Sequence, residues 1–201
     1  MNLIEPLNHN LAKLVQAAAD AYAASGDEGA IAFADPLRAT PGPFHLPMSE
    51  PAHAPAWLPA ALDALPEDDL APALRCSASV IPWIIGGAKM PASFAGRSAY
   101  NEIVGPDGFA ASDVLRFGLY AQAPESFYPP HDHAAEEFYY VLSGTALWQK
   151  GEEALSPRPP GSCIRHAPWQ RHAMKTMAEP LLALWVWIGD LDMASYRMEG
   201  T

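Results

Sequence analysis

The feature that most constrains this fold is a series of short apolar segments separated by turn signals, which occupies the C-terminal two thirds of the chain. Gly and Pro clusters such as residues 105–108 and 157–161 separate these segments, and the 21 prolines of the chain disfavour long helices. Many short strands joined by turns predict a β-sandwich or barrel. The predicted strands are residues 80–85, 114–121, 136–142, 145–150, 162–166 and 182–188.

The N-terminal part has a different periodicity and is predicted to be helical. Its apolar residues at helical spacing are Leu7, Leu11, Leu14, Val15, Ala18 and Tyr22. Asn8 or Asn10 is expected to cap this helix, and Ser25-Gly26 to end it. Residues 36–55 are rich in proline and predict an extended connector, and residues 57–65 carry a second short apolar stripe. We therefore predict an α+β chain, with a helical extension (1–72) packed on a β-barrel (73–201).

Composition narrows the possible partners and the compartment. Twelve Lys and Arg residues against 23 Asp and Glu give a net charge of -11, which disfavours nucleic acid and anionic membranes as partners. The two cysteines do not form a disulfide scaffold, and the longest apolar run (181–189) is about half of what a membrane span needs. Without a visible export signal, the expectation is a cytoplasmic protein, either a monomer or a homodimer.

One stretch carries the residue types of a metal site. His131, His133, Glu137 and Tyr139 all occupy odd positions, and side chains along a strand alternate between its two faces. If the segment is extended, or is a strand pair that keeps this alternation, the four side chains point the same way. Two imidazoles and a carboxylate on one side suit a divalent transition metal ion. Zinc, iron, manganese, cobalt and nickel all remain possible.

A further ligand should come from residues 159–172, which offer His166 and His172. His172 follows a turn that could bring it to the same cavity, whereas His166 lies in the strand before the turn. His131 is open to a second interpretation, because Pro129-Pro130 could turn it toward a substrate. With two or three imidazoles and one carboxylate, such a site keeps open coordination positions, as catalytic sites do.

The spacing His131-x-His133-x3-Glu137-x6-Gly144 resembles the first cupin motif, and Pro159 to His172 resembles the second. This resemblance implies a small β-barrel with His131, His133, Glu137 and His172 as metal ligands. Two positions depart from the motifs. Glu125 stands where the first motif usually opens with Gly, and Thr176 stands where Asn often follows the second-motif His.

The chain is also similar to the cupin-type dimethylsulfoniopropionate (DMSP) lyases of marine bacteria, most like the DddQ family. That family has a helical extension on a cupin barrel. The resemblance implies Tyr139 as a phenol beside the metal, Tyr128 as a second tyrosine before the two histidines, and Trp187 as part of the pocket wall. Trp83 and Trp169 are further candidates for this wall.

These residues suggest a chemistry for a small zwitterionic substrate. A nearby cation lowers the pKa of a phenol, so Tyr139 could act as a general base, with Tyr128 as the other candidate. Aromatic faces favour an onium group, and the metal favours a carboxylate. The expected reaction is a β-elimination that gives dimethyl sulfide and acrylate. Another metallocupin enzyme, such as an iron dioxygenase or an isomerase, and a non-catalytic binding cupin are the alternatives.

Overall fold

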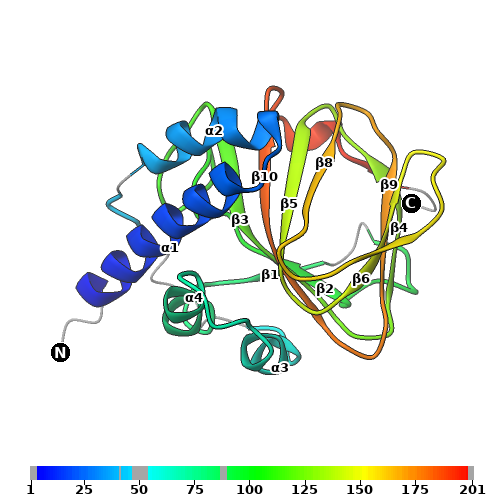
Figure 1. Ribbon diagram of the computed structural model, residues 1–201, viewed down its shortest axis with the longest axis horizontal. Coiled ribbons are helices and arrows are strands. Elements are labelled where there is room, and N and C mark those ends of the chain that lie inside the picture. Colours follow the sequence, from blue (N-terminus) through cyan, green and yellow to red (C-terminus); the bar gives the residue numbers. More distant parts are fainter. Residues whose placement is uncertain (1–3, 41, 47–53, 87–89, 199–201) are drawn as a thin grey trace.

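The computed structural model describes residues 4–40, 42–46, 54–86 and 90–198, and it consists of two facing β-sheets with helices on one side (Figure 1). The helices are α1 (Ile4–Ala24), α2 (Glu28–Arg38), α3 (Leu58–Asp63), α4 (Ala71–Ser77) and the 3₁₀ helix η1 (Met193–Ser195). The strands are β1 (Ile84–Ile85), β2 (Ser98–Tyr100), β3 (Leu115–Gln122), β4 (Phe127–Asp132), β5 (Glu136–Ser143), β6 (Ala146–Lys150), β7 (Ser156–Arg158), β8 (Cys163–His166), β9 (His172–Thr176), β10 (Leu181–Ile188) and β11 (Arg197–Met198).

The two sheets are built from strands that are distant in the sequence. The larger sheet has the order β1-β2-β3-β10-β5-β8, and the smaller has the order β11-β4-β9-β6-β7. Neighbouring strands in both sheets run antiparallel. The chain therefore passes back and forth between the sheets, which confirms the predicted α+β architecture with a mainly β barrel.

Strand β10 is buried on both of its faces. Leu182, Leu184 and Val186 belong to the core shared with the helices, whereas Trp185 and Trp187 belong to the core between the sheets. A strand that is covered on both sides needs apolar residues at every position. This double burial explains why residues 181–188 show no polar alternation in the sequence.

The helices pack on the outer face of the larger sheet through an aromatic cluster. The Tyr22 ring of α1 lies 4.9 Å from the Phe33 ring of α2 and 5.8 Å from the Tyr140 ring of β5. The Tyr22 hydroxyl also donates a hydrogen bond to the Phe138 carbonyl (3.4 Å). The helices and this sheet thus share one continuous core, and α4 continues through residue 72, where the sequence predicted the boundary.

The predicted end of the first helix is confirmed, but its predicted start is wrong. Helix α1 ends at Ala24, before Gly26, whose φ of 79° suits glycine. At the other end, α1 begins at Ile4, so Asn8 and Asn10 lie inside it. Asn8 has a different task, since its Oδ1 accepts a hydrogen bond from the Phe44 backbone N–H (2.6 Å).

Helix α2 was not expected, and it shortens the predicted connector. Asp27 caps it by accepting hydrogen bonds from the backbone N–H groups of Gly29 (2.9 Å) and Ala30 (3.1 Å). The helix runs through Pro36, so the segment from residue 36 is helical up to Arg38. Residues 47–53 of the predicted connector lie outside the described residues. The second apolar stripe is confirmed as α3.

Five of the six predicted strands are present within one residue at each end. The prediction for residues 80–85 is wrong over most of its length, because only Ile84–Ile85 is a strand and Val80 lies in an exposed turn. Strands β4 and β9, which carry histidines of the predicted site, were missed. The two prolines of β4 and the polar residues of both strands hide the alternation that marks a strand.

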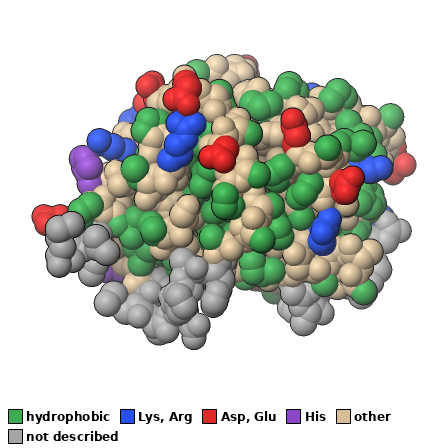
Figure 2. Space-filling model, turned by 90° about the horizontal axis from the view of Figure 1, so that it is seen from below, with side chains coloured by type: hydrophobic (Ala, Val, Ile, Leu, Met, Phe, Trp, Pro, Cys, Tyr) green, Lys and Arg blue, Asp and Glu red, His purple; other side chains and the backbone are tan. Residues whose placement is uncertain are grey.

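The described surface carries charges of both signs. Figure 2 shows acidic and basic side chains scattered over one face, with apolar side chains between them. In the described part of the chain, no helix is both long enough and apolar enough to cross a membrane.

Gly144 is expected to be the more sensitive of two glycines with left-handed backbone. It has a φ of +74°, and an added Cβ would lie 2.1 Å from the Pro180 carbonyl oxygen. Gly161 has a φ of +85° and open space around it, so Gly161→Ala should cost only the backbone term of about 1–2 kcal/mol. Gly144→Ala should cost about 2–5 kcal/mol in urea unfolding, because steric overlap adds to that term. Equal losses for the two variants would contradict this account.

Candidate metal centre and active site

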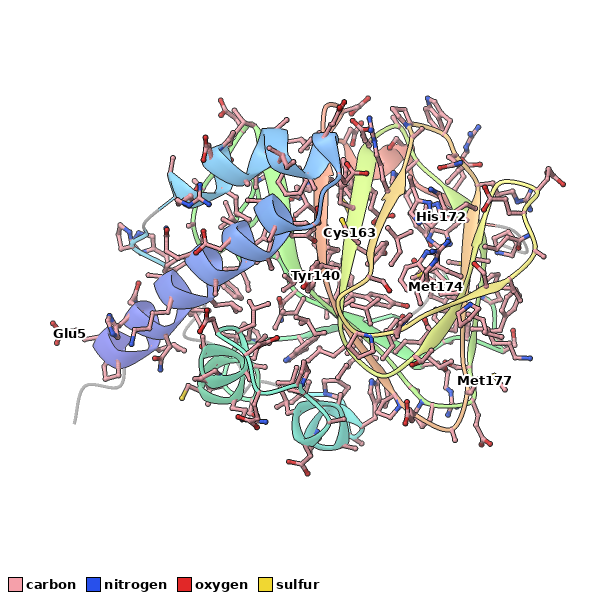
Figure 3. The ribbon with its side chains drawn as sticks, viewed as in Figure 1. Glu5, Tyr140, Cys163, His172, Met174 and Met177 are labelled. Atoms are coloured by element: carbon pink, nitrogen blue, oxygen red, sulfur yellow. The ribbon has the colours of Figure 1, made fainter. Side chains whose placement is uncertain are left out.

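The side chains predicted to point the same way do meet inside the barrel. His131 lies on β4, His133 in the following turn, and Glu137 and Tyr139 on β5, and each is at most 4% exposed. The intervening Phe138 of β5 faces the helices instead. In Figure 3, Tyr140 and Cys163 lie on the helix side of the larger sheet, whereas His172 and Met174 lie between the sheets.

Three of these residues form a compact group around one carboxylate oxygen. Glu137 Oε2 lies 3.0 Å from His172 Nε2 and 3.2 Å from His133 Nε2. Ligand atoms of these three residues lie within 4.8 Å of one another, and all three side chains are buried. Among the described residues, this is the group of His, Cys, Asp and Glu side chains that could hold a metal ion.

The hydrogen bonds behind the two imidazoles aim their other nitrogens at Glu137. His133 Nδ1 lies 3.1 Å from the Ala135 carbonyl oxygen, and His172 Nδ1 lies 2.8 Å from that of Gln170. A carbonyl only accepts, so each Nδ1 carries a proton, and Nε2 is the ring nitrogen that faces Glu137 and could bind a metal ion.

Two imidazole nitrogens therefore lie close to a buried carboxylate oxygen, an arrangement that needs positive charge on or between these groups. Either extra protons or a metal ion could supply that charge. With metal–ligand bonds of about 2.0–2.2 Å at tetrahedral angles, ligand atoms are separated by about 3.3 Å. The observed separations of 3.0 and 3.2 Å are close to this value. The residues present thus fit a divalent metal ion.

His131 lies beside this group without joining it. Its Nδ1 is 2.8 Å from the Pro129 carbonyl oxygen, and its ring centre is 4.0 Å from the His172 ring. The opposite neighbour is Tyr128, whose ring stacks on His131 at 4.0 Å. His131 lines the cavity, so both predicted roles, metal ligand and substrate contact, stay predictions.

His166 has a different partner for the nitrogen that a metal would need. Its Nε2 accepts a hydrogen bond from the Trp148 indole N–H (3.0 Å). The ring stacks on His172 with 3.9 Å between centres and lies outside the group of three. Of the two histidines that the sequence offered as a further ligand, the geometry favours His172.

Glu137 is held in its ionised form at this position. Burial alone would raise its pKa, but neighbouring His133 and His172 hold the pKa well below the ordinary value. The second carboxylate oxygen, Oε1, accepts a hydrogen bond from the Trp187 indole N–H (2.7 Å). Trp187 thus orients the carboxylate so that Oε2 faces the two imidazoles, in addition to its predicted place in the cavity wall.

Tyr139 lies next to the carboxylate, and its protonation depends on the local charge. Burial, followed by the negative charge of Glu137, raises the pKa of the Tyr139 phenol well above its ordinary value. The lowered pKa expected from the sequence must therefore come from a bound cation, since the protein alone has the opposite effect. Burial likewise raises the pKa of Tyr128.

A cavity of about 560 Å³ opens beside these residues, and its wall is largely aromatic. Besides Tyr139, the aromatic lining residues are Tyr100, Tyr120, Tyr128, Trp185, Trp187 and Tyr196. No Lys or Arg occurs among the described residues of this wall, where Glu137 is the acidic side chain. The cavity therefore suits a cationic group that can lie against aromatic faces.

The prediction that Trp83 and Trp169 line the cavity is wrong for both residues. Trp83 is buried in the helix-side core and donates its indole N–H to the Ala78 carbonyl (2.7 Å). Trp169 is 49% exposed on a surface turn. Four aromatic lining residues were missed, namely Tyr100, Tyr120, Trp185 and Tyr196. The alternation along β3 could have identified Tyr120, whereas nothing in the sequence near Tyr196 marks it.

Two facing antiparallel sheets around a buried His/Glu group that could hold a metal ion define a cupin. Both departures from the cupin motifs are accommodated in this structure. Glu125 takes a φ of 51°, the left-handed conformation that glycine adopts most easily. Thr176 Oγ1 donates to the Ala123 carbonyl (2.6 Å) and accepts from the Ser126 backbone N–H (3.0 Å), so it joins the end of β9 to the start of β4.

Comparison with known proteins assigns the family within the cupins. The family model for dimethylsulfoniopropionate lyase matches residues 43–183, and the chain belongs to this family. It is 36% identical over 110 residues to DMSP lyase DddQ of Ruegeria pomeroyi, covering 54% of each chain. It is 34% identical over 119 residues to the putative DMSP lyase DddL of Cereibacter sphaeroides, covering 58% of this chain and 50% of that protein. The chain thus spans about half the length of these curated relatives.

Solved structures support the same assignment over most of the fold. One chain from the crystal structures of the DMSP lyases RdDddP and RnDddQII superimposes with a TM-score of 0.73 at 26% identity. The alignment covers 95% of this chain and 98% of that one. DddQ from Ruegeria pomeroyi DSS-3 gives a TM-score of 0.64 at 26% identity, with coverages of 90% and 96%.

Removing individual histidines should rank their importance for metal binding. His133→Ala and His172→Ala should each lower the affinity for zinc by more than about 100-fold, since even outer partners of ligands contribute about 10–100-fold. His131→Ala should have a smaller effect, and exposed His9→Ala should have none. Competition with a chromophoric chelator measures these affinities. Equal losses for His131→Ala and His133→Ala would place His131 among the ligands.

The metal-free protein should lose stability in mild acid because of its buried histidines. Burial first, and the nearby charge of His172 second, hold the pKa of both His131 and His166 well below the ordinary value. The unfolded chain therefore binds more protons below about pH 6.5, so the free energy of unfolding falls as the pH falls.

Each such histidine contributes a slope of up to about 1.4 kcal/mol per pH unit below that point. His166→Gln keeps an acceptor for Trp148 but cannot titrate. The free energy of unfolding of this variant should therefore fall by about 1.4 kcal/mol less between pH 6.5 and 5 than that of the unmodified protein. Urea unfolding in the presence of a chelator measures this slope, with exposed His9→Gln as the control. An unchanged slope in His166→Gln would show that His166 is not held neutral.

Proposed function

We propose that this chain is a metal-dependent carbon–sulfur lyase that cleaves DMSP into dimethyl sulfide and acrylate. The observation that carries the proposal is the buried phenol of Tyr139, which lies next to Glu137 in the His/Glu group of a DMSP lyase family member. Elimination of a neutral leaving group needs one base and no acid. A site with one suitably placed phenol is sufficient for that chemistry.

The substrate has two ends that suit different parts of the cavity. Its sulfonium group would lie against aromatic faces such as Tyr128 and Trp187, each contributing about 0.5–2 kcal/mol. Its carboxylate needs a positive partner, and the described lining offers no Lys or Arg. The His/Glu group is therefore the expected place for the carboxylate end, and His131 borders it as either a ligand or a substrate contact.

In the proposed reaction, Tyr139 as phenolate removes a proton from the carbon next to the substrate carboxylate. The electron pair of that C–H bond forms the double bond of acrylate, and the β-carbon–sulfur bond breaks. Its electrons leave with sulfur as dimethyl sulfide, and the proton stays on Tyr139 until it passes to solvent. Tyr128 is the alternative base, and Trp187 keeps Glu137 oriented throughout.

A divalent cation held by His133, Glu137 and His172, with Tyr139 as a further ligand, would supply Lewis-acid stabilisation of negative charge on the substrate carboxylate and favour the Tyr139 phenolate. Zinc, iron, manganese, cobalt and nickel all suit two imidazoles and a carboxylate. Elemental analysis of the purified protein identifies the ion.

We further propose that the protein works in the cytoplasm of a marine bacterium, as a monomer or a homodimer. Cys76 and Cys163 are both unpaired, which suits a reducing compartment. Fractionation of the source cells and the mass of the protein in solution test the two parts of this proposal.

Replacing adjacent tyrosines should separate the proposed base from its surroundings. Tyr139→Phe should lower kcat for dimethyl sulfide release by about 10²–10⁴-fold while metal content stays the same. Tyr140→Phe is the matched control, because that neighbour faces the helices and should leave kcat unchanged. Gas chromatography of the headspace over an anaerobic reaction measures the product.

The anaerobic condition also discriminates the other functions. An iron dioxygenase needs oxygen, and an isomerase or a binding protein releases no dimethyl sulfide. Full activity in Tyr139→Phe would exclude Tyr139 as the base and leave Tyr128 to be tested. Absence of product from the metal-loaded protein would contradict the proposed function as a whole.

A further inference from the structure

The C-terminal segment Met193–Met198, which we call the strap, forms one wall of the cavity. Met193, Ala194 and Tyr196 are all lining residues. The Tyr196 hydroxyl lies 2.8 Å from the Tyr128 hydroxyl, and the Tyr196 ring lies 5.5 Å from the His131 ring. One of the two hydroxyls donates to the other, so the acceptor keeps a proton that can bind a substrate oxygen.

The strap is attached to the turn that carries His133. Strand β11 pairs with β4, which places Arg197 opposite Asp132. The Arg197 guanidinium binds the Asp132 carboxylate at 2.7 Å. One residue beyond His133, the Ala134 backbone N–H donates to Ser195 Oγ (3.1 Å).

Arg197 also reaches the turn before His172. Its guanidinium lies over the Trp169 ring, 4.3 Å from the ring centre. Trp169 has a φ of 62°, a costly conformation for a bulky residue, and its backbone N–H donates to the His133 carbonyl (2.8 Å). Arg197 is therefore the point where the strap meets both turns that present the metal-binding histidines.

We propose that Arg197 is a positioning residue that fixes the strap and thereby places Tyr196 against the substrate, opposite Tyr128. This inference rests on the proposed function for the identity of the substrate. It adds a substrate contact from outside both cupin motifs, and it makes binding of a small zwitterion depend on a surface ion pair and a cation–π contact. Arg197 acts through Tyr196 and does not itself line the cavity.

Three variants and one control separate the parts of this proposal. Arg197→Gln removes both the ion pair and the cation–π contact. Trp169→Gly removes the cation–π contact and keeps the ion pair. Because glycine adopts a left-handed backbone without strain, this variant is expected to stay folded. Tyr196→Phe removes the hydroxyl alone. Arg75→Gln breaks a comparably exposed ion pair with Glu67, far along the chain in α4, and serves as the control.

Three measurements are made on the metal-loaded protein. Hydrogen exchange of peptides covering 193–198 reports how firmly the strap is held. KM and kcat for DMSP, together with calorimetric titration of glycine betaine, report on the site. Glycine betaine carries an onium group and a carboxylate but cannot undergo this elimination, so its binding is readable even if the proposed lyase activity fails.

Arg197→Gln should speed exchange of the strap about tenfold, because an exposed ion pair and an exposed cation–π contact are lost together. Arg197→Gln and Trp169→Gly should both raise KM and weaken glycine betaine binding about three- to tenfold, with kcat changed by less than about twofold. Tyr196→Phe should weaken binding similarly without faster exchange. Arg75→Gln should change none of these quantities.

Unchanged exchange in Arg197→Gln would show that Arg197 does not hold the strap. Faster exchange with unchanged KM and unchanged glycine betaine binding would show that the strap is not part of the substrate site. If the unmodified protein releases no dimethyl sulfide, exchange and glycine betaine binding still test Arg197, and only the identity of the substrate is lost.

Discussion

The interaction between Glu137 and the imidazoles of His133 and His172 is the feature on which the rest of the site depends. All three groups are buried, and the backbone contacts of the two imidazoles turn their Nε2 atoms toward a carboxylate oxygen 3.0–3.2 Å away. Buried polar groups packed this closely are unfavourable unless a positive charge joins them. The barrel supplies the rigid surroundings that keep the group together, and the cavity beside it supplies room for a substrate.

The surrounding structure serves this group on several sides. Trp187 on the double-buried strand β10 holds one oxygen of Glu137, so the apolar core fixes the polar site. Trp148 binds His166, which in turn stacks on His172. The strap contacts the two turns that present His133 and His172. Helices on the outer face support the larger sheet without reaching the cavity, which fits their separate position in the sequence.

Much of this site could be predicted because alternation along a strand is a local property. Residues 131, 133, 137 and 139 share parity, and the turn between β4 and β5 preserves it. What the sequence could not predict depends on pairing between distant strands. The Trp148 indole N–H of β6 donates a hydrogen bond to His166 Nε2, and only the fold brings those two residues together. Helix α2 was missed although Asp27 and the spacing of Phe33 and Leu37 signal it, because its last residues belong to the proline-rich stretch 36–55 that predicts an extended connector. Tyr196 has no local signal, since its role arises from the pairing of β11 with β4.

X-ray absorption spectroscopy at the metal edge of the freshly purified protein tests the central claim most directly. We expect about one transition-metal ion per chain. Two imidazole nitrogens and at least one oxygen should coordinate this ion at about 2.0–2.2 Å. A protein that binds no transition metal, or one whose spectrum lacks histidine ligands, would contradict the claim that Glu137 and its two imidazoles form a metal centre.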